Sequence, residues 1–310
     1  MIQIDSITFL ALIILSYVLV CAGFDSKIFE KIPKLLFKIC YPALILVSFA
    51  YLETDLERHH TVFVIVFTAL CSFLIYFGAY AILSRYRNEK RKELIAFYMV
   101  VGNVTFVGLP FIYLFFGIFG VSFAILFGVV QDIIIWSFSY VRFSGKRDFK
   151  QILKAILNPC FIAVVVGFII AGSPLVLPDA AKLPIQMLSD TTIPLALLYV
   201  GSLLAQNKGV LKSVNRGAVF AVCIKTLVLP ALAYATMRIV GVDIFLAMLC
   251  SFLLSLPAPI LLIIFAEEFN KDVAFANAVF VVSVVLFLIL CLALLLLQTT
   301  GHITLQRNIM

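Results

Sequence analysis

Residues 102–110 read GNVTFVGLP and residues 256–259 read LPAP, and each stretch interrupts a run of apolar residues. A proline inside a helix removes a backbone donor and clashes with the carbonyl one turn back, which costs roughly 3 kcal/mol. In hydrocarbon, such a break is tolerated only where the freed backbone groups face protein or a water-filled cavity. Two breaks that concentrate glycine and proline in this way predict a functional crossing of two membrane helices.

The chain around these breaks is too apolar for a water-soluble domain. Of its 310 residues 64% are hydrophobic and 13% are charged, and the mean hydropathy is +1.17. A soluble domain averages about 45–50% apolar and about 25% charged residues. Stretches such as 283–297, SVVLFLILCLALLLL, do not alternate, which argues against a membrane β-barrel. The sequence therefore predicts an all-α polytopic membrane protein.

Ten transmembrane helices are expected, because ten apolar runs approach the roughly 20 residues needed to cross about 30 Å of hydrocarbon. The first run lacks a basic n-region and an A-x-A site, so we expect it to be a retained span. The predicted spans are residues 6–23, 35–52, 61–83, 94–116, 119–142, 152–172, 186–205, 216–240, 243–266 and 274–297.

The loops between these spans orient the chain. The odd-numbered loops hold 17 Lys and Arg residues, from Lys27 to Lys271, and the even-numbered loops hold only Arg58, Lys182 and Arg238. By the positive-inside rule the odd loops are cytoplasmic, so both termini should be extracellular in a multi-pass protein of the cell membrane. The net charge is +7, but the basic residues lie between apolar runs and form no patch of their own, so the charge does not indicate binding to nucleic acid.

Unusual features recur at nearly constant spacing along the chain. Pro42 in span 2 and Pro194 in span 7 are 152 positions apart, and Pro110 and Pro259 are 149 positions apart. We therefore expect a duplication, with a first five-helix repeat at 1–150 and a second at 151–310. Five spans per repeat is an odd number, so the second copy must be inverted in the membrane. Paired interrupted spans in inverted repeats are typical of the binding site of a secondary transporter.

The two breaks predict a site for an anion. Each second half-helix would present unpaired N–H groups and a partial positive charge at its N-terminus. The two half-helices run in opposite directions, so these ends should converge. Asn103 would add an amide and Thr105 a hydroxyl for orienting the bound group.

The string GNVTFVGLPF resembles the N-x-x-x-x-G-x-P signature of the auxin efflux carrier family. The stretch 255–285, SLPAPILLIIFAEEFNKDVAFANAVFVVSVV, looks like that family's proline crossover, short charged loop and last helix. Further positions also fit the family: Asn158, Pro159, Gly167, Pro194, Leu197, Leu198, Gly201 and Leu204.

The resemblance implies a ten-helix fold of the bile acid and auxin carrier type, with crossed broken helices 4 and 9. It implies a scaffold from spans 1, 2, 6 and 7 and a transport bundle from spans 3–5 and 8–10. Plant members often carry an amide where this chain has Ala258, whereas prokaryotic members are mostly linked to malate, malonate or similar carboxylates. The residues expected to bind substrate are Asn103, Thr105, Gly108, Pro110, Pro257, Ala258 and Pro259.

Two ionisable residues fall well inside predicted spans of the transport bundle. Asp132 lies near the centre of span 5 beside Gln131, and Lys225 lies about ten residues into span 8. Charges in the membrane are costly and usually functional. The pair could be a static ion pair or could titrate to couple transport to protons, so Asp132, Lys225 and Gln131 are candidate coupling residues.

Other functions fit the sequence less well. A sodium or proton antiporter, or a sodium-coupled symporter of similar fold, would need carboxylates beside the breaks, and residues 100–112 and 254–264 contain no Asp or Glu. No stretch resembles the carbonyl filter or charged ring of a channel. The three histidines do not suggest the nucleophile–base pair or metal site that an enzyme would need. The seven cysteines lie singly, and His59 and His60 have no third ligand nearby, so no metal and no cofactor are expected. The expected partners are a small organic anion and membrane lipids, together with a second copy of the chain through the scaffold helices.

Overall fold

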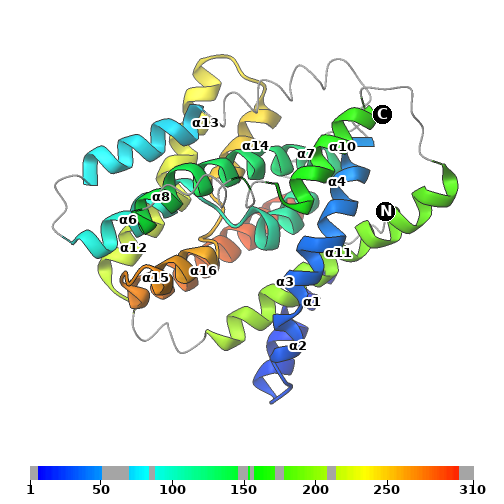
Figure 1. Cartoon of the computed structure of the whole chain (residues 1–310), viewed down its shortest axis with the longest axis horizontal. Helices are drawn as coiled ribbons and strands as arrows, with labels where there is room; N and C mark the ends of the chain where they lie inside the picture. Colours follow the sequence, from blue (N-terminus) through cyan, green and yellow to red (C-terminus); the bar gives the residue numbers. More distant parts are fainter. Residues whose placement is uncertain are drawn as a thin grey trace. The chain divides into compact units, whose positions relative to one another are not determined.

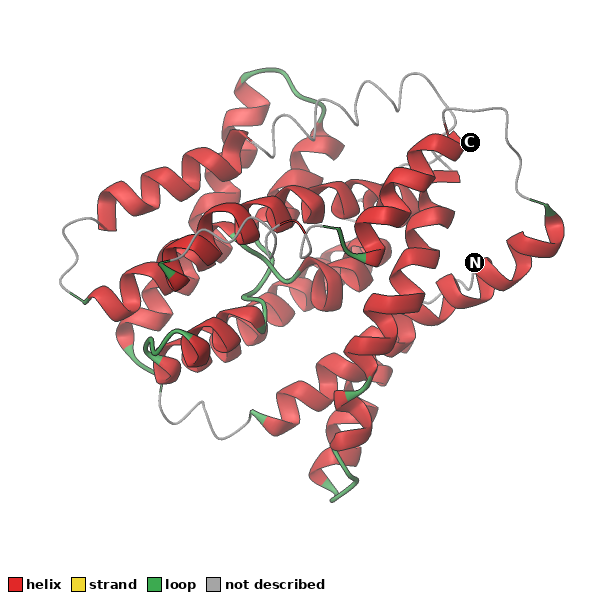
Figure 2. Cartoon of the chain, viewed as in Figure 1, coloured by secondary structure: helices red, strands yellow, loops and turns green. Residues whose placement is uncertain are grey.

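The computed structural model describes residues 6–50, 70–83, 88–145, 153, 157–171, 178–207 and 214–299. All regular elements among these residues are helices (Figure 2). Their order along the chain (Figure 1) is α1 Ser6–Cys21, α2 Lys27–Glu30, α3 Ile32–Leu35, η1 Leu36–Cys40, α4 Tyr41–Ala50, the helix Leu70–Ile82, α6 Glu89–Val100, η3 Val104–Gly108, α7 Leu109–Ile134, η4 Ile135–Ser139, α8 Tyr140–Ser144, α10 Pro159–Ala171, α11 Asp179–Gln206, α12 Arg216–Cys223, η6 Ile224–Val228, α13 Leu229–Ile239, α14 Ile244–Leu254, α15 Leu261–Glu268 and α16 Val273–Thr299.

The protein is an all-α membrane protein. Within the described ranges, five helical segments are long and apolar enough to cross a membrane: Lys27–Phe49, Val104–Ser144, Ala180–Gln206, Arg216–Ile239 and Val273–Leu297. Shorter apolar helices accompany them at Thr8–Cys21, Leu70–Ile82, Pro159–Ala171 and Ile244–Leu254.

Val104–Ser144 has 41 residues, more than one span needs, and it is divided at Gly117. Gly117 has φ 66° and ψ −164°, a conformation that glycine adopts without strain. The predicted boundary between spans 94–116 and 119–142 falls at this residue.

The chain forms two compact units. Unit 1 consists of Met1–Phe63, Thr105–Ile125 and Leu153–Lys208, and unit 2 consists of Val64–Val104, Leu126–Ile152 and Gly209–Met310. Each unit takes segments from both predicted repeats. The boundary between Val104 and Thr105 lies inside the first interrupted stretch, so the chain passes from one unit to the other at the break.

In unit 1 the long helix α11 packs against α1 and α4, and α4 also packs against α10. Gly201 of α11 permits the closest of these approaches. A Cβ atom built at this glycine would lie 2.1 Å from the Ile13 carbonyl oxygen and 2.1 Å from the Ser16 hydroxyl of α1. No side chain fits there, so glycine sets the spacing of α1 and α11.

Three helices widen into a π-helical turn just before a proline. These turns, η1, η3 and η6, end at Cys40, Gly108 and Val228, two residues before Pro42, Pro110 and Pro230. Proline lacks an N–H and its ring clashes with the carbonyl one turn earlier. A wider turn relieves this clash, so each helix continues through its proline.

In unit 2, helices α15 and α16 pack together and are joined by a tight turn (orange in Figure 1). Asn270, two residues after the end of α15, has φ 52°, a left-handed conformation that asparagine tolerates better than most residues. The N–H of Lys271 then bonds to the Ala266 carbonyl at 2.8 Å. Asp272 follows and accepts a hydrogen bond from the Phe275 N–H at 2.9 Å, which caps the start of α16.

Candidate substrate site at a helix crossing

The first break follows α6, which ends at Val100, and residues 101–103 are not helical. The break frees backbone groups, and Gln131 of α7 binds two of them. Its Oε1 accepts from the Gly102 N–H at 3.1 Å, and its Nε2 donates to the Val100 carbonyl at 2.9 Å. The Gln131 side chain is buried, so one amide replaces the helical bonds lost at the break.

The second break separates α14, which ends at Leu254, from α15, which begins at Leu261. Ser283 of α16 serves it in a similar way. Its hydroxyl accepts from the Ala258 N–H at 2.9 Å and donates to the Phe280 carbonyl at 2.9 Å. Gln131 and Ser283 are 152 positions apart, the same spacing as Pro42 and Pro194.

The two breaks touch each other within unit 2. The Asn103 N–H donates to the Pro257 carbonyl oxygen at 2.8 Å. Gly102 makes this approach possible, because a Cβ atom there would lie 2.8 Å from the Cβ of Leu256. Each break therefore supplies a backbone partner to the other, and the glycine and proline content of the two stretches is explained by their contact.

A lysine completes the polar groups at the first break. Lys225 lies in the π-helical turn η6, and its Nζ donates to the Val101 carbonyl at 2.6 Å. The same Nζ is 4.7 Å from the centroid of the Tyr98 ring, and the residue is only 2% exposed. The Tyr98 hydroxyl is 3.5 Å from the Thr226 hydroxyl. The Lys225 amine is thus buried against the crossing.

The predicted binding residues fall into both units. In unit 2, Asn103, Pro257 and Ala258 are buried and Pro259 is half-buried. In unit 1, Thr105 is half-buried and its carbonyl accepts a hydrogen bond from the Tyr41 hydroxyl. Gly108 and Pro110, also of unit 1, are buried at the junction of η3 and α7.

The coupling candidates all belong to unit 2. Gln131 bridges the first break and Lys225 contacts the same break, while Asp132 is half-buried in α7. The expected approach of Asp132 and Lys225 stays a prediction. His59 and His60 lie outside the described residues, and within them no group of three or more His, Cys, Asp or Glu could hold a metal ion.

Sequence reasoning did not find Ser283 or Tyr98. Ser283 could have been found by applying the spacing of 152 to Gln131, but a lone serine in an apolar helix carries no signal by itself. Tyr98 could not have been found, because its role depends on which face of α6 is turned toward Lys225.

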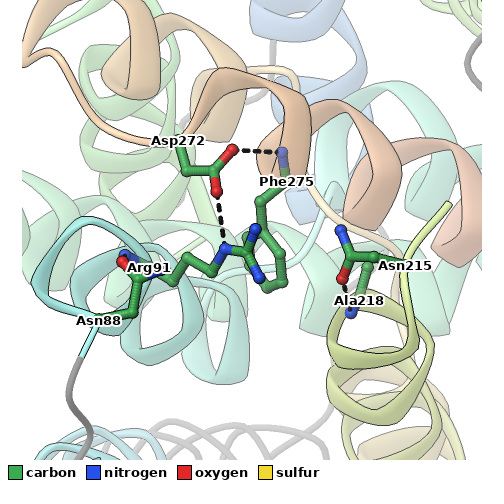
Figure 3. A network of polar contacts seen from close by, with 6 residues as sticks. All are labelled: Asn88, Arg91, Asn215, Ala218, Asp272 and Phe275. Carbon is green, nitrogen blue, oxygen red and sulfur yellow. Dashed lines mark hydrogen bonds and ion pairs between the residues drawn. The ribbon is translucent and has the colours of Figure 1, made fainter. Parts of the chain in front are cut away.

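A second polar cluster lies at the N-terminal end of α6 (Figure 3). The Arg91 Nε donates to an Asp272 carboxylate oxygen at 2.6 Å, and Lys271 forms an ion pair with Glu93. Figure 3 also shows Asn88 and Asn215 capping α6 and α12 by accepting from the N–H groups of Arg91 and Ala218.

The surroundings of Asp272 lower the pKa of its carboxyl group. Burial raises the pKa of Asp272, but the Phe275 N–H, the Arg91 side chain and the charge of Lys90 lower it more. The net pKa is below the usual value, so the charged form is favoured where the α15–α16 turn meets α6.

Apolar membrane-spanning helices, with two broken segments bonded to each other at their breaks, define this protein as a membrane transport protein by class. The comparison with known families agrees. The chain belongs to the membrane transport protein family, the auxin efflux carrier family, whose model matches residues 2–151 and, a second time, residues 146–295. The chain thus contains two repeated halves of a transporter family, which is not an enzyme family. No curated protein matches the chain.

Proposed function

We propose that this protein is a secondary active transporter that carries a small organic anion, such as a carboxylate, across the cell membrane. The anion binds where the two broken helices cross. The observation that carries the proposal is the bond from the Asn103 N–H to the Pro257 carbonyl, which joins the two breaks at 2.8 Å. Crossed breaks of this kind are characteristic of carrier binding sites near the middle of the membrane.

The polar groups at the crossing favour a negative charge. Lys225 brings a buried ammonium to the first break, and α15 begins at Leu261, directly after the second, so its N-terminal dipole points toward that break. Residues 100–112 and 254–264 contain no Asp or Glu to oppose an anion. Asn103, buried in the first break, is our candidate for the directional contact.

The proposed architecture has ten spans in two inverted five-helix repeats, with spans 4 and 9 broken. Support comes from the two family matches and from the excess of Lys and Arg in odd loops. Both termini are then extracellular. Cysteines at Ser6 and Asn308, in a background without the native cysteines, should react with an impermeant reagent from outside; protection of either would contradict the topology.

The proposed scaffold consists of spans 1, 2, 6 and 7, and the proposed transport bundle consists of spans 3–5 and 8–10. The division into units supports this assignment in part. Unit 1 contains α1, α4, α10 and α11, and unit 2 contains α6 and α12–α16. The proposed bundle includes all of spans 4 and 5, whereas residues 105–125, which form parts of both spans, belong to unit 1. A homodimer through the scaffold helices is part of the proposal.

Replacing Asn103 by alanine tests the site. A charge-assisted hydrogen bond in a partly dehydrated cavity is worth about 1.5–3 kcal/mol, so N103A should weaken carboxylate binding by roughly one to two orders of magnitude. Binding of malate and malonate to the purified protein is measured together with its melting temperature.

Asn215→Ala is the matched control. Asn215 caps α12 in the same unit, so its loss should lower stability by about 1 kcal/mol and leave carboxylate affinity unchanged. Equal carboxylate affinity in N103A and the wild type would contradict the proposed site. Preference for organic cations over carboxylates would contradict the anion.

A further inference from the structure

Lys225 lies where a broken helix presents its negative end. The carbonyl that accepts from its Nζ, at 2.6 Å, belongs to Val101, the first residue after α6. The C-terminal end of a helix carries a partial negative charge from its unpaired carbonyls. The Tyr98 ring, 4.7 Å from the same Nζ, presents a second group that attracts cations.

A carbonyl at a helix C-terminus and an aromatic ring are both groups that attract cations. In carriers with broken helices, unwound carbonyls and the C-terminal ends of half-helices coordinate the coupling sodium ion or proton. Here the same kinds of groups contact an ammonium that is covalently part of the chain. Lys225 is only 2% exposed, so its Nζ meets the Val101 carbonyl away from solvent.

We propose that the Lys225 ammonium takes the place of a coupling sodium ion at the crossing, so that anion binding by this chain does not require sodium. The inference rests on the proposed function, because it takes the crossing to be the transport site. Lys225 acts as a positioning residue: it holds the end of α6 in the crossed conformation.

The lysine is specific to one repeat. The position 152 residues earlier is Phe73, whose ring packs on Phe77 and Phe138. Duplication therefore does not explain the presence of Lys225. By contrast, Gln131 and Ser283 are separated by the same number of positions as Pro42 and Pro194, as expected for equivalent positions of the two repeats. The built-in cation distinguishes the α6 break from its counterpart after α14.

The test compares the response to sodium of the full-length wild-type protein, K225A and K225R. Melting temperatures are measured in sodium and in choline chloride at equal ionic strength. The wild type should melt at the same temperature in both salts. K225A, which leaves a buried carbonyl unpaired, should melt about 5 °C lower in choline. Sodium or methylammonium should restore at least half of that loss.

Lys92→Met is the matched control in the same unit. Lys92 is also buried, and its Nζ lies 5.1 Å from the Tyr80 ring, but it pairs with Glu89 near the N-terminal end of α6. K92M should show no response to sodium or methylammonium. A purely structural role of Lys225 would give K225A the same cation-independent loss as K92M, and that result would overturn the proposal.

The melting temperature of the wild type in the two salts tests the proposal even if K225A does not fold. Sodium-specific stabilisation of the wild type would overturn the inference, and equal melting in both salts, retained by K225R, would support it. Carboxylate binding measured in the same two salts separates this inference from the proposed function. Binding only in sodium would contradict the inference alone, and absence of binding in both salts would contradict the proposed function alone.

Discussion

The side chains that bridge the breaks stabilise the interrupted helices by bonding to backbone groups that the breaks leave free. Gln131 satisfies the Gly102 N–H and the Val100 carbonyl, and both would otherwise be buried without partners. Ser283 does the same for the Ala258 N–H. These residues explain why two stretches rich in glycine and proline can remain folded where water does not replace their lost bonds.

Gln131→Ala should therefore be strongly destabilising. It leaves one donor and one acceptor unpaired, each at a cost of about 1–3 kcal/mol, so the melting temperature should fall clearly. Gln131→Glu, which can still accept from Gly102, should lose less. Gln186→Ala is the control: Gln186 bonds to Asp190 on the partly buried face of α11, and its loss should cost under about 0.5 kcal/mol. Equal losses at positions 131 and 186 would contradict this role.

The sequence indicates where the two breaks lie better than it indicates which groups contact them. The interrupted stretches follow from glycine and proline, whose backbone preferences are local. That Asn103 bonds to Pro257, or Lys225 to Val101, depends on the rotation of each helix about its axis. A helix that is apolar all round does not encode that rotation in its own pattern, so the sequence marks Lys225 as unusual without assigning it to a break.

Among the helices, the packing of α1 on α11 depends on one glycine. Gly201→Ala would place a methyl group 2.1 Å from backbone and hydroxyl oxygens of α1, so the helices must separate. We expect a loss of about 1–3 kcal/mol, measured by thermal melting of the purified protein. Gly78→Ala, in the helix Leu70–Ile82, is the control, because nothing lies within 4 Å of a Cβ there. A neutral G201A would contradict the close approach.

The junction of α6 with the α15–α16 turn should be sensitive to acid. The pKa of Asp272 is lowered in the folded protein, so its stabilisation is present above the unfolded value of about 3.9 and is lost as pH falls through the folded value. Asp272→Asn keeps a cap for α16 but loses the charge that attracts Arg91. The pair is partly exposed, so the expected loss near pH 7 is at most about 1 kcal/mol.

Melting curves of the wild type and D272N, recorded from neutral to acidic pH, test this prediction. The two proteins should differ most near pH 7 and converge below about pH 4. Asp272→Ala, which removes the cap as well, should be less stable than D272N throughout. A difference between wild type and D272N that grows toward low pH would contradict the assignment.

The positions of the helices are easier to predict from the sequence than the local backbone conformation at their turns and ends. The prolines at 42, 110 and 230 can be read from the sequence. The widened turns before them depend on how each helix relieves the clash between the proline ring and the carbonyl one turn earlier. The sequence predicts a boundary between spans 94–116 and 119–142, but it does not show that the positive φ of Gly117 makes the turn there possible. The short α15–α16 connection depends on Asn270 and Asp272, whose turn and cap chemistry is readable once the helix ends are known.

For the protein as a whole, composition and repeat spacing were sufficient to predict an all-α transporter with two repeated halves, and the family matches confirm that class. They could not predict the division into units. Thr105–Ile125 belongs with α1, α4 and α11, although Asn103 and Val104 belong to the other unit. This grouping depends on contacts distant in sequence, which no local pattern contains.

Counterflow in proteoliposomes tests most directly whether this protein is a carrier of organic anions. Vesicles containing the purified wild-type protein are loaded with unlabelled malate or malonate and diluted into a trace of the radiolabelled anion. A carrier with one alternating site should accumulate label transiently, because unlabelled internal anion occupies the site as it returns outward and keeps the labelled anion from being carried back. N215A should retain this uptake and N103A should lose most of it. Uptake that does not depend on internal anion, or exchange of sodium or organic cations in place of carboxylates, would contradict the account.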